Sequence, residues 1–97
     1  MRKEVDAKMF PRYVEEREEI LRLLDAGRTI EFVDRRPRLN LEYREVWTLV
    51  ARSPRKARVK YYRNGELLLE DIIVVNEHDL GTMLRNPTVS WRVVDKS

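Results

Sequence analysis

The chain of 97 residues is long enough for one small domain, and a hydrophobic share of 42% excludes a disordered tail. Its formal net charge is +3, from 20 Lys and Arg against 17 Asp and Glu, and the absence of Cys excludes disulfides, thiol nucleophiles and cysteine metal sites. No apolar run approaches the ~20 residues of a membrane helix and no signal-peptide pattern opens the chain, so we expect a single cytoplasmic domain over residues 1–97 that does not contact a membrane.

The first predicted element is an amphipathic helix over residues 11–26. Its apolar residues recur mostly on one face of a 3.6-residue repeat. Pro11 suits the first turn of such a helix. Gly27 follows the last periodic residue, where a left-handed conformation ends many helices.

Alternating segments after Gly27 predict a set of short strands. These strands lie at about 29–33, 43–51, 57–63, 66–75 and 88–94. A short helix is predicted over 77–85, because Asn76 can cap its first turn and Asn86-Pro87 ends it.

Asn64-Gly65 lies between two of these strands and favours a type I′ hairpin turn. Such a turn sets the register of the strands that it joins. It predicts that Arg63 faces Glu66, Tyr62 faces Leu67, Lys60 faces Leu69 and Arg58 faces Asp71.

This order of elements predicts an α+β fold, in which an N-terminal amphipathic helix packs on a curved, mostly antiparallel sheet of about five strands, with a short helix before the last strand. Barrels of the Sm type share the order, but the chain lacks their glycine-centred motifs. A sheet wrapped around one long helix, as in cystatin-like folds, is equally compatible. Partial closure of the sheet into a barrel remains an open alternative.

The run Ile72–Val75 is apolar on both faces, a pattern typical of a strand that is central or covered on both sides. One N-terminal helix covers only one face of a sheet. We therefore expect either that the sheet closes on itself or that its second face meets another subunit in a homodimer.

The positive charge is concentrated between residues 49 and 63, which carry six basic and no acidic side chains. On an alternating strand, Lys56, Arg58, Lys60 and Tyr62 share one face, at intervals of about 6.6 Å. A row of cations beside an aromatic ring is the combination that binds single-stranded nucleic acid, because cations follow the phosphates and the ring stacks on a base. Tyr61 is predicted to point to the opposite face of the strand, into the core.

The leading interpretation is therefore a small basic protein that binds nucleic acid, with single-stranded DNA or RNA favoured over a duplex. Gln is absent and Arg outnumbers Lys by 15 to 5, a composition typical of proteins that work at high temperature. The predicted nucleic-acid-binding residues are Arg52, Arg55, Lys56, Arg58, Lys60, Tyr62 and Arg63, with Arg35, Arg36 and Arg38 from a preceding loop.

Two alternatives remain open. The basic strand could be a solvated edge or could dock an acidic partner in a protein-interaction or structural module, such as a viral or homo-oligomeric one. A ribonuclease without a sequence signature is a weaker alternative. His78, the single histidine, lies at a predicted helix start, and no catalytic constellation or metal-ligand spacing is present, so we expect a protein that is not an enzyme and needs no cofactor.

Overall fold

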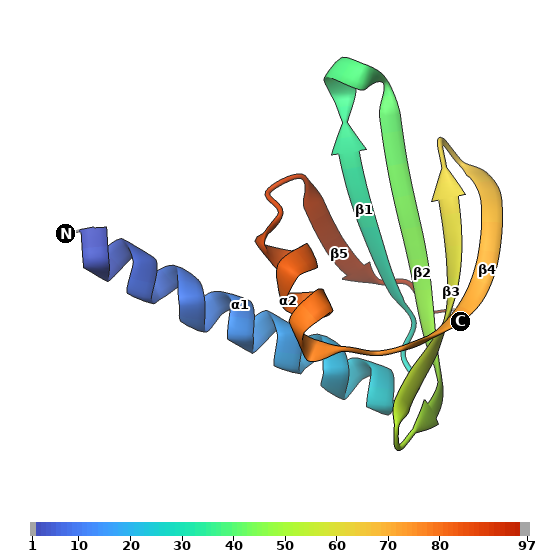
Figure 1. The fold of residues 1–97 in the computed structure, drawn as a ribbon, viewed down its shortest axis with the longest axis horizontal. Coiled ribbons are helices and arrows are strands. Elements are labelled where there is room, and N and C mark those ends of the chain that lie inside the picture. The colour runs from blue at the N-terminus through green and yellow to red at the C-terminus, as the bar shows by residue number, and fades with distance from the viewer. Residues whose placement is uncertain (1, 96–97) are drawn as a thin grey trace.

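The computed structural model describes residues 2–95, and the surroundings of side chains over 13–95. Within this range the chain forms two α-helices and five strands (Figure 1). Their bounds are α1 Arg2–Asp25, β1 Ile30–Arg36, β2 Leu41–Arg52, β3 Arg55–Arg63, β4 Glu66–Val74, α2 Glu77–Arg85 and β5 Val89–Val93, with a short 3-10 turn, Pro37–Leu39, between β1 and β2.

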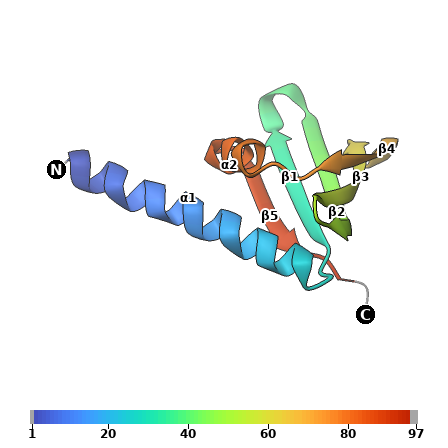
Figure 2. The same ribbon diagram turned by 60° about the horizontal axis from the view of Figure 1, so that its bottom comes forward.

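The strands form one antiparallel sheet in the order β4-β3-β2-β1-β5, which confirms the predicted α+β class. The sheet curves but does not close, so β4 and β5 are free edges and the barrel alternative is wrong. Figure 2 shows both helices on one side of the sheet. The other side, called the open face below, has no helix over it.

The core lies between the two helices and the covered face of the sheet. Ile20 and Leu24 of α1 and Leu80 of α2 are fully buried there. Ile30, Trp47 and Val59 lie opposite one another on β1, β2 and β3, so they form one apolar row beneath the helices. No helix in the described part of the chain is long and apolar enough to cross a membrane.

Helix α1 begins well before the predicted start at residue 11. Residues 2–9 are mostly Arg, Lys, Glu, Ala and Met, which favour helix formation, so the helix extends through them and Pro11 lies within it. At the other end, Gly27 has a φ of 84°, and the backbone N–H of Arg28 donates to the carbonyl of Leu23 at 2.9 Å. These are the features of a left-handed helix end, as predicted.

Helix α2 matches its predicted range and cap. The side chain of Asn76 accepts hydrogen bonds from the backbone N–H groups of His78 and Asp79 at 2.8 and 3.2 Å. Strand β1 is longer than predicted, because Asp34, Arg35 and Arg36 continue its pairing with β2 up to Pro37.

The β3–β4 hairpin has the predicted turn but only part of the predicted register. Asn64 and Gly65 both have positive φ, and Tyr62 faces Leu67. A β-bulge leaves Leu68 without a partner, so Lys60 faces Glu70 rather than Leu69. The next pair on the open face is Arg58 and Ile72, where Asp71 was predicted. The bulge thereby moves every later residue of β4 to the face opposite to the predicted one.

Strand β4 is not covered on both sides, contrary to the expectation from its apolar run. It is an edge strand, with β3 as its one neighbour in the sheet. Ile72 is 51% exposed and Val74 60%, and Leu67, Leu68 and Leu69 are each about half exposed. The edge of the sheet at β4 therefore presents backbone groups and apolar side chains together.

Candidate nucleic-acid interface

The predicted row of cations lies along β3, on the open face of the sheet. Ala57 and Val59 are fully buried beneath the helices. Their neighbours along the strand must point the other way, since successive side chains of a strand alternate. We call these neighbours the β3 stripe: Lys56, Arg58, Lys60 and Tyr62.

The two lysines of the β3 stripe have no ion-pair partner among residues 13–95. Arg58, between them, forms a salt bridge in which its Nε lies 3.2 Å from Oε2 of Glu70. These side chains are 52% and 43% exposed. An exposed pair of this kind contributes about 0–1 kcal/mol, so it is a weak competitor for another anion.

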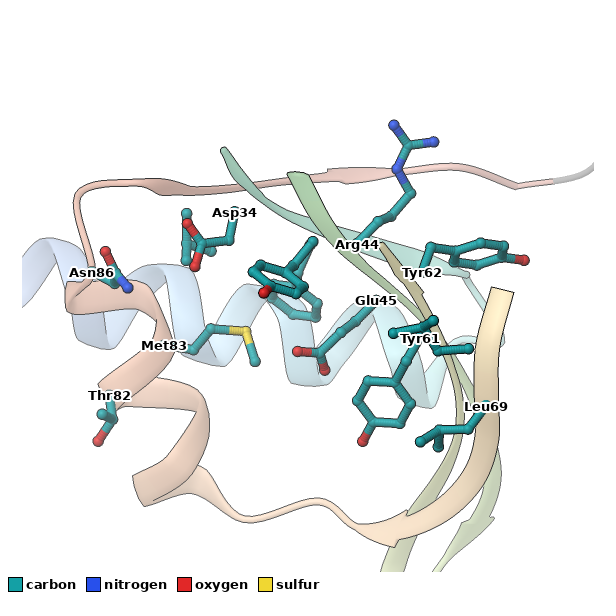
Figure 3. A pocket seen from close by; sticks show the side chains of 13 residues that line it. Asp34, Arg44, Glu45, Tyr61, Tyr62, Leu69, Thr82, Met83 and Asn86 are labelled. Atoms are coloured by element: carbon teal, nitrogen blue, oxygen red, sulfur yellow. The ribbon is translucent and has the colours of Figure 1, made fainter. Parts of the chain in front are cut away.

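Tyr62 shares the open face with the lysines, as predicted, and its side chain is half-buried. Figure 3 shows its ring directed away from that of Tyr61. Tyr61 packs against the core, as do Trp47 and Trp91. The ring of Tyr62 is therefore the aromatic group that accompanies the cations on this strand.

Arg52 and Arg55 are not part of the β3 stripe, because both bind Asp25 at the end of α1. Arg55 donates from Nε and Nη2 to the two carboxylate oxygens of Asp25, at 2.9 and 2.8 Å. Arg52 donates from Nη2 to the backbone carbonyl of Asp25 at 2.9 Å. The hydrogen bonds between Arg55 and the carboxylate of Asp25 lower the pKa of Asp25 and raise that of Arg55. Both arginines thus fasten the end of α1 to the β2–β3 turn.

Arg63 also lies apart from the stripe. It faces Tyr43 on β2 and Glu66 on β4, on the same side of β3 as Tyr61 and Val59. The prediction grouped Arg63 with Lys60 as binding residues. The two are close along the chain but lie on opposite faces of the sheet, because successive side chains alternate and Arg63 is on the covered side.

The three arginines before β2 are arranged around the β1–β2 connection. Arg35 lies 3.5 Å from the carboxylate of Glu42, and Arg36 donates to Asp34 at 3.2 Å. Arg38 is exposed in the 3-10 turn. Of the three, Arg35 lies in β1 on the same face as Val33 and the β3 stripe, with β2 between the two strands.

Two further arginines on the open face were not among the predicted binding residues. Arg92 donates from Nε to Oε1 of Glu31 at 2.8 Å, and Arg44 approaches Oε2 of the same carboxylate at 3.5 Å. Arg44 also donates to Glu42 at 3.0 Å. Glu31 is only 5% exposed, so two cations surround one buried carboxylate in the middle of the sheet. Alternation along β2 is enough to predict the face on which Arg44 lies, but its ion-pair partners depend on the order of the strands.

The open face as a whole carries more cations than carboxylates. Its cations are Arg35, Arg44, Lys56, Arg58, Lys60 and Arg92, and its carboxylates are Glu31, Glu42 and Glu70. The carboxylates are all engaged by arginines. Four arginines share these three carboxylates, and Lys56 and Lys60 are the two cations of this face that form no salt bridge within the described residues.

No group of three or more metal-ligating side chains occurs in the described part of the chain. His78 is exposed at the start of α2, as expected for a histidine at a helix terminus. Comparison with known protein families, with curated sequences and with solved structures gives no match.

Proposed function

We propose that the protein binds single-stranded nucleic acid on the open face of its sheet, without catalysing a reaction on it. The observation that carries the proposal is the β3 stripe. Lys56 and Lys60 form no salt bridge within the described residues, although Lys60 faces Glu70, which is paired with Arg58. Both lysines lie on a face that neither helix covers. Tyr62 continues the same row.

The spacing of the stripe suits an extended polyanion. Alternate residues of a strand are about 6.6 Å apart, a distance comparable to that between successive phosphates of an extended nucleic-acid strand. Arg58 would join the two lysines by exchanging Glu70 for a phosphate, at little cost because the pair is exposed.

A single strand suits this face better than a duplex does. The ring of Tyr62 can stack on an unpaired base, whereas the bases of a duplex are already stacked on one another. A major groove admits a helix or a two-stranded ribbon, whereas the stripe lies on β3, the second strand of a five-stranded sheet, with β4 and β2 on either side. The preference for one strand thus follows from the position of β3.

Binding is tested by fluorescence anisotropy with labelled single-stranded DNA, single-stranded RNA and duplex DNA at several salt concentrations. We expect the single strands to bind more tightly than the duplex, with an affinity that falls steeply as salt increases. The double variant Lys56→Gln/Lys60→Gln should weaken binding and reduce the slope of log affinity against log salt by about 1.4, or about 0.7 for each phosphate that the variant no longer neutralises.

The matched control is Arg22→Gln/Arg63→Gln. It removes the same charge from α1 and from the covered side of β3, and should leave the slope nearly unchanged. Equal weakening by both double variants would show that only net charge matters and would contradict a site on the open face. Absence of binding at low salt would refute the proposed function.

The second candidate function is a homo-oligomeric interaction module, and the exposure of β4 favours it. Ile72 and Val74 lie on the open face at the free edge of the sheet, and the backbone of this edge has no partner strand. Sedimentation velocity over a range of protein concentrations tests it. This candidate predicts a dimer that the variant Ile72→Lys/Val74→Lys converts to monomer, with nucleic-acid binding absent in both forms.

A further inference from the structure

A cavity lies on the covered side of the sheet, beside α2. Its volume is about 460 Å³, within the range of ligand sites in proteins. Phe32, Tyr43 and Tyr61 supply aromatic rings to its wall, and Leu69 and Met83 supply aliphatic groups. Figure 3 shows the side chains of Glu45, Tyr61 and Met83 converging on the same space between α2 and the sheet.

Glu45 occupies an unusual place in this wall. It faces Phe32 on β1 and Tyr61 on β3, and Phe32 in turn faces Trp91. A carboxylate therefore stands in the middle of a row that is otherwise aromatic. Glu45 is half-buried, and partial burial of a carboxylate without a compensating charge costs folding free energy, so an apolar residue would fit this row better.

The carboxylate of Glu45 has one hydrogen bond from the protein and no cationic partner in the described part of the chain. Its Oε1 accepts from Nε1 of Trp47 at 3.1 Å. Burial raises its pKa, and the hydrogen bond from Trp47 offsets this only in part. Nearby Tyr61 also has a raised pKa, because of its burial and then of the negative charges of Glu45 and Asp71.

The other charged groups of the wall are already satisfied. Asp34 accepts hydrogen bonds from Thr88 Oγ1 at 2.6 Å and from Arg36 at 3.2 Å. Arg44 touches the cavity, but Figure 3 shows its guanidinium directed away from it, and that group binds Glu42 on the open face. Glu45 is thus the one carboxylate of the wall that lacks a counterion.

We propose that this cavity binds a small organic amine in its ammonium form. The carboxylate of Glu45 accepts a hydrogen bond from the ammonium group. The faces of the tyrosine rings attract the same positive charge. The alkyl part of the ligand packs against Leu69 and Met83. Glu45 lies on the opposite face of the sheet from Lys56 and Lys60, so the amine site does not depend on binding of phosphates by these lysines. Tyr62 of the β3 stripe also touches the cavity.

The test uses three probes of one shape and different charge: n-hexylammonium, 1-hexanol and hexanoate. Each is titrated into ¹⁵N-labelled protein at neutral pH while the indole N–H signals are recorded. The signal of Trp47, assigned with a Trp91→Phe variant, reports on the site because this group donates to Glu45. We expect hexylammonium to shift the Trp47 signal and to bind roughly tenfold or more tightly than hexanol, and hexanoate to bind least.

The variant Glu45→Gln keeps an acceptor for Trp47 and removes the charge. It should abolish the preference for hexylammonium over hexanol while hexanol still binds, which also shows that the cavity has kept its shape. The control Glu42→Gln makes the same change in charge on the same strand but on the open face, and should keep the preference.

Three results would each overturn the proposal. Hexylammonium could bind no more tightly than hexanol, it could leave the Trp47 signal unchanged, or the two variants could weaken its binding equally. In the last case the attraction would come from overall charge and not from Glu45.

Discussion

Arg55, at the start of β3, holds the carboxylate of Asp25, in the last turn of α1, through two parallel hydrogen bonds of 2.9 and 2.8 Å. An acidic residue at the C-terminal end of a helix is unfavourable, because the helix dipole is negative there. Arg55 offsets this charge, and Arg52 binds the carbonyl of the same residue. Arg52 and Arg55, which lie close to the β3 stripe in the sequence, therefore connect the end of α1 to the sheet. We call their contacts with Asp25 the clasp.

This clasp should make stability depend on pH. The pKa of Asp25 is lowered from 3.8 chiefly by its hydrogen bonds from Arg55, so its contribution is present above about pH 3.8 and is lost as the pH falls through the lower folded-state pKa. We expect Asp25→Asn to reduce the free energy of unfolding by about 1 kcal/mol at pH 7, and by less at pH 2. Urea denaturation at the two pH values measures this. A cost that is equal at both would contradict an electrostatic clasp.

Glu45 should have the opposite effect. Its pKa is raised in the folded protein, so the folded state holds this proton more tightly than the unfolded chain does. Its stabilising contribution is full below about pH 4.5 and decreases as the pH rises through the folded-state pKa. Glu45→Gln should therefore increase stability at pH 7 by roughly 0.5–1 kcal/mol and change it little at pH 3. Destabilisation at pH 7 would mean that the charge has a partner in the fold.

Gly81, in α2, should be replaceable by alanine with a gain in stability. A Cβ at this position would have Nη1 of Arg17 as its nearest neighbour at 3.7 Å, an ordinary contact. The substitution should add roughly 0.5–1 kcal/mol, because alanine favours the helix. The control is Gly65→Ala in the β3–β4 turn, where a φ of 83° disfavours a side chain and stability should fall by about 1 kcal/mol. Thermal unfolding of both variants checks the contrast, and a loss of stability at Gly81 would show closer packing of α2 on α1.

Two isoleucines of the sheet should differ in their contribution to stability. Ile30 is fully buried in the row beneath the helices, and Ile72 is 51% exposed at the edge. Ile30→Ala should cost about 2–5 kcal/mol and Ile72→Ala less than about 1 kcal/mol. Urea denaturation at several protein concentrations compares them. A large cost for Ile72 that grows with protein concentration would support the homodimer, since the residue would then be buried between subunits.

Several features follow from neighbouring residues alone, and these were predictable. The turn at Asn64-Gly65, the cap by Asn76 and the end of α1 at Gly27 each depend on residues that adopt or satisfy a particular local conformation. Lys56 and Lys60 lie on the face of β3 that is opposite to the face of Val59. This follows from alternation along one strand, which needs no knowledge of the rest of the fold.

Other features depend on more than one strand and could not be predicted in this way. The bulge at Leu68 changes the face of every later residue of β4, and nothing in the local sequence requires it. The order of the strands places the apolar β4 at an edge rather than in the centre. Propensity and alternation carry no information about either, because both result from the packing of the whole sheet.

The kind of each element, most of the turns and caps, and the row of cations on β3 could be predicted from the local sequence, because hydrophobic periodicity and turn chemistry act within a few residues. Long-range packing, in contrast, sets which of the described cations form ion pairs and which do not. It separates Arg55 and Arg63 from the stripe and surrounds Glu31 with Arg44 and Arg92. It also places Glu45 in an aromatic wall without a counterion among residues 13–95. These outcomes are pairwise contacts between distant segments, and only the folded chain brings their charges within the few ångströms over which ion pairs and desolvation act.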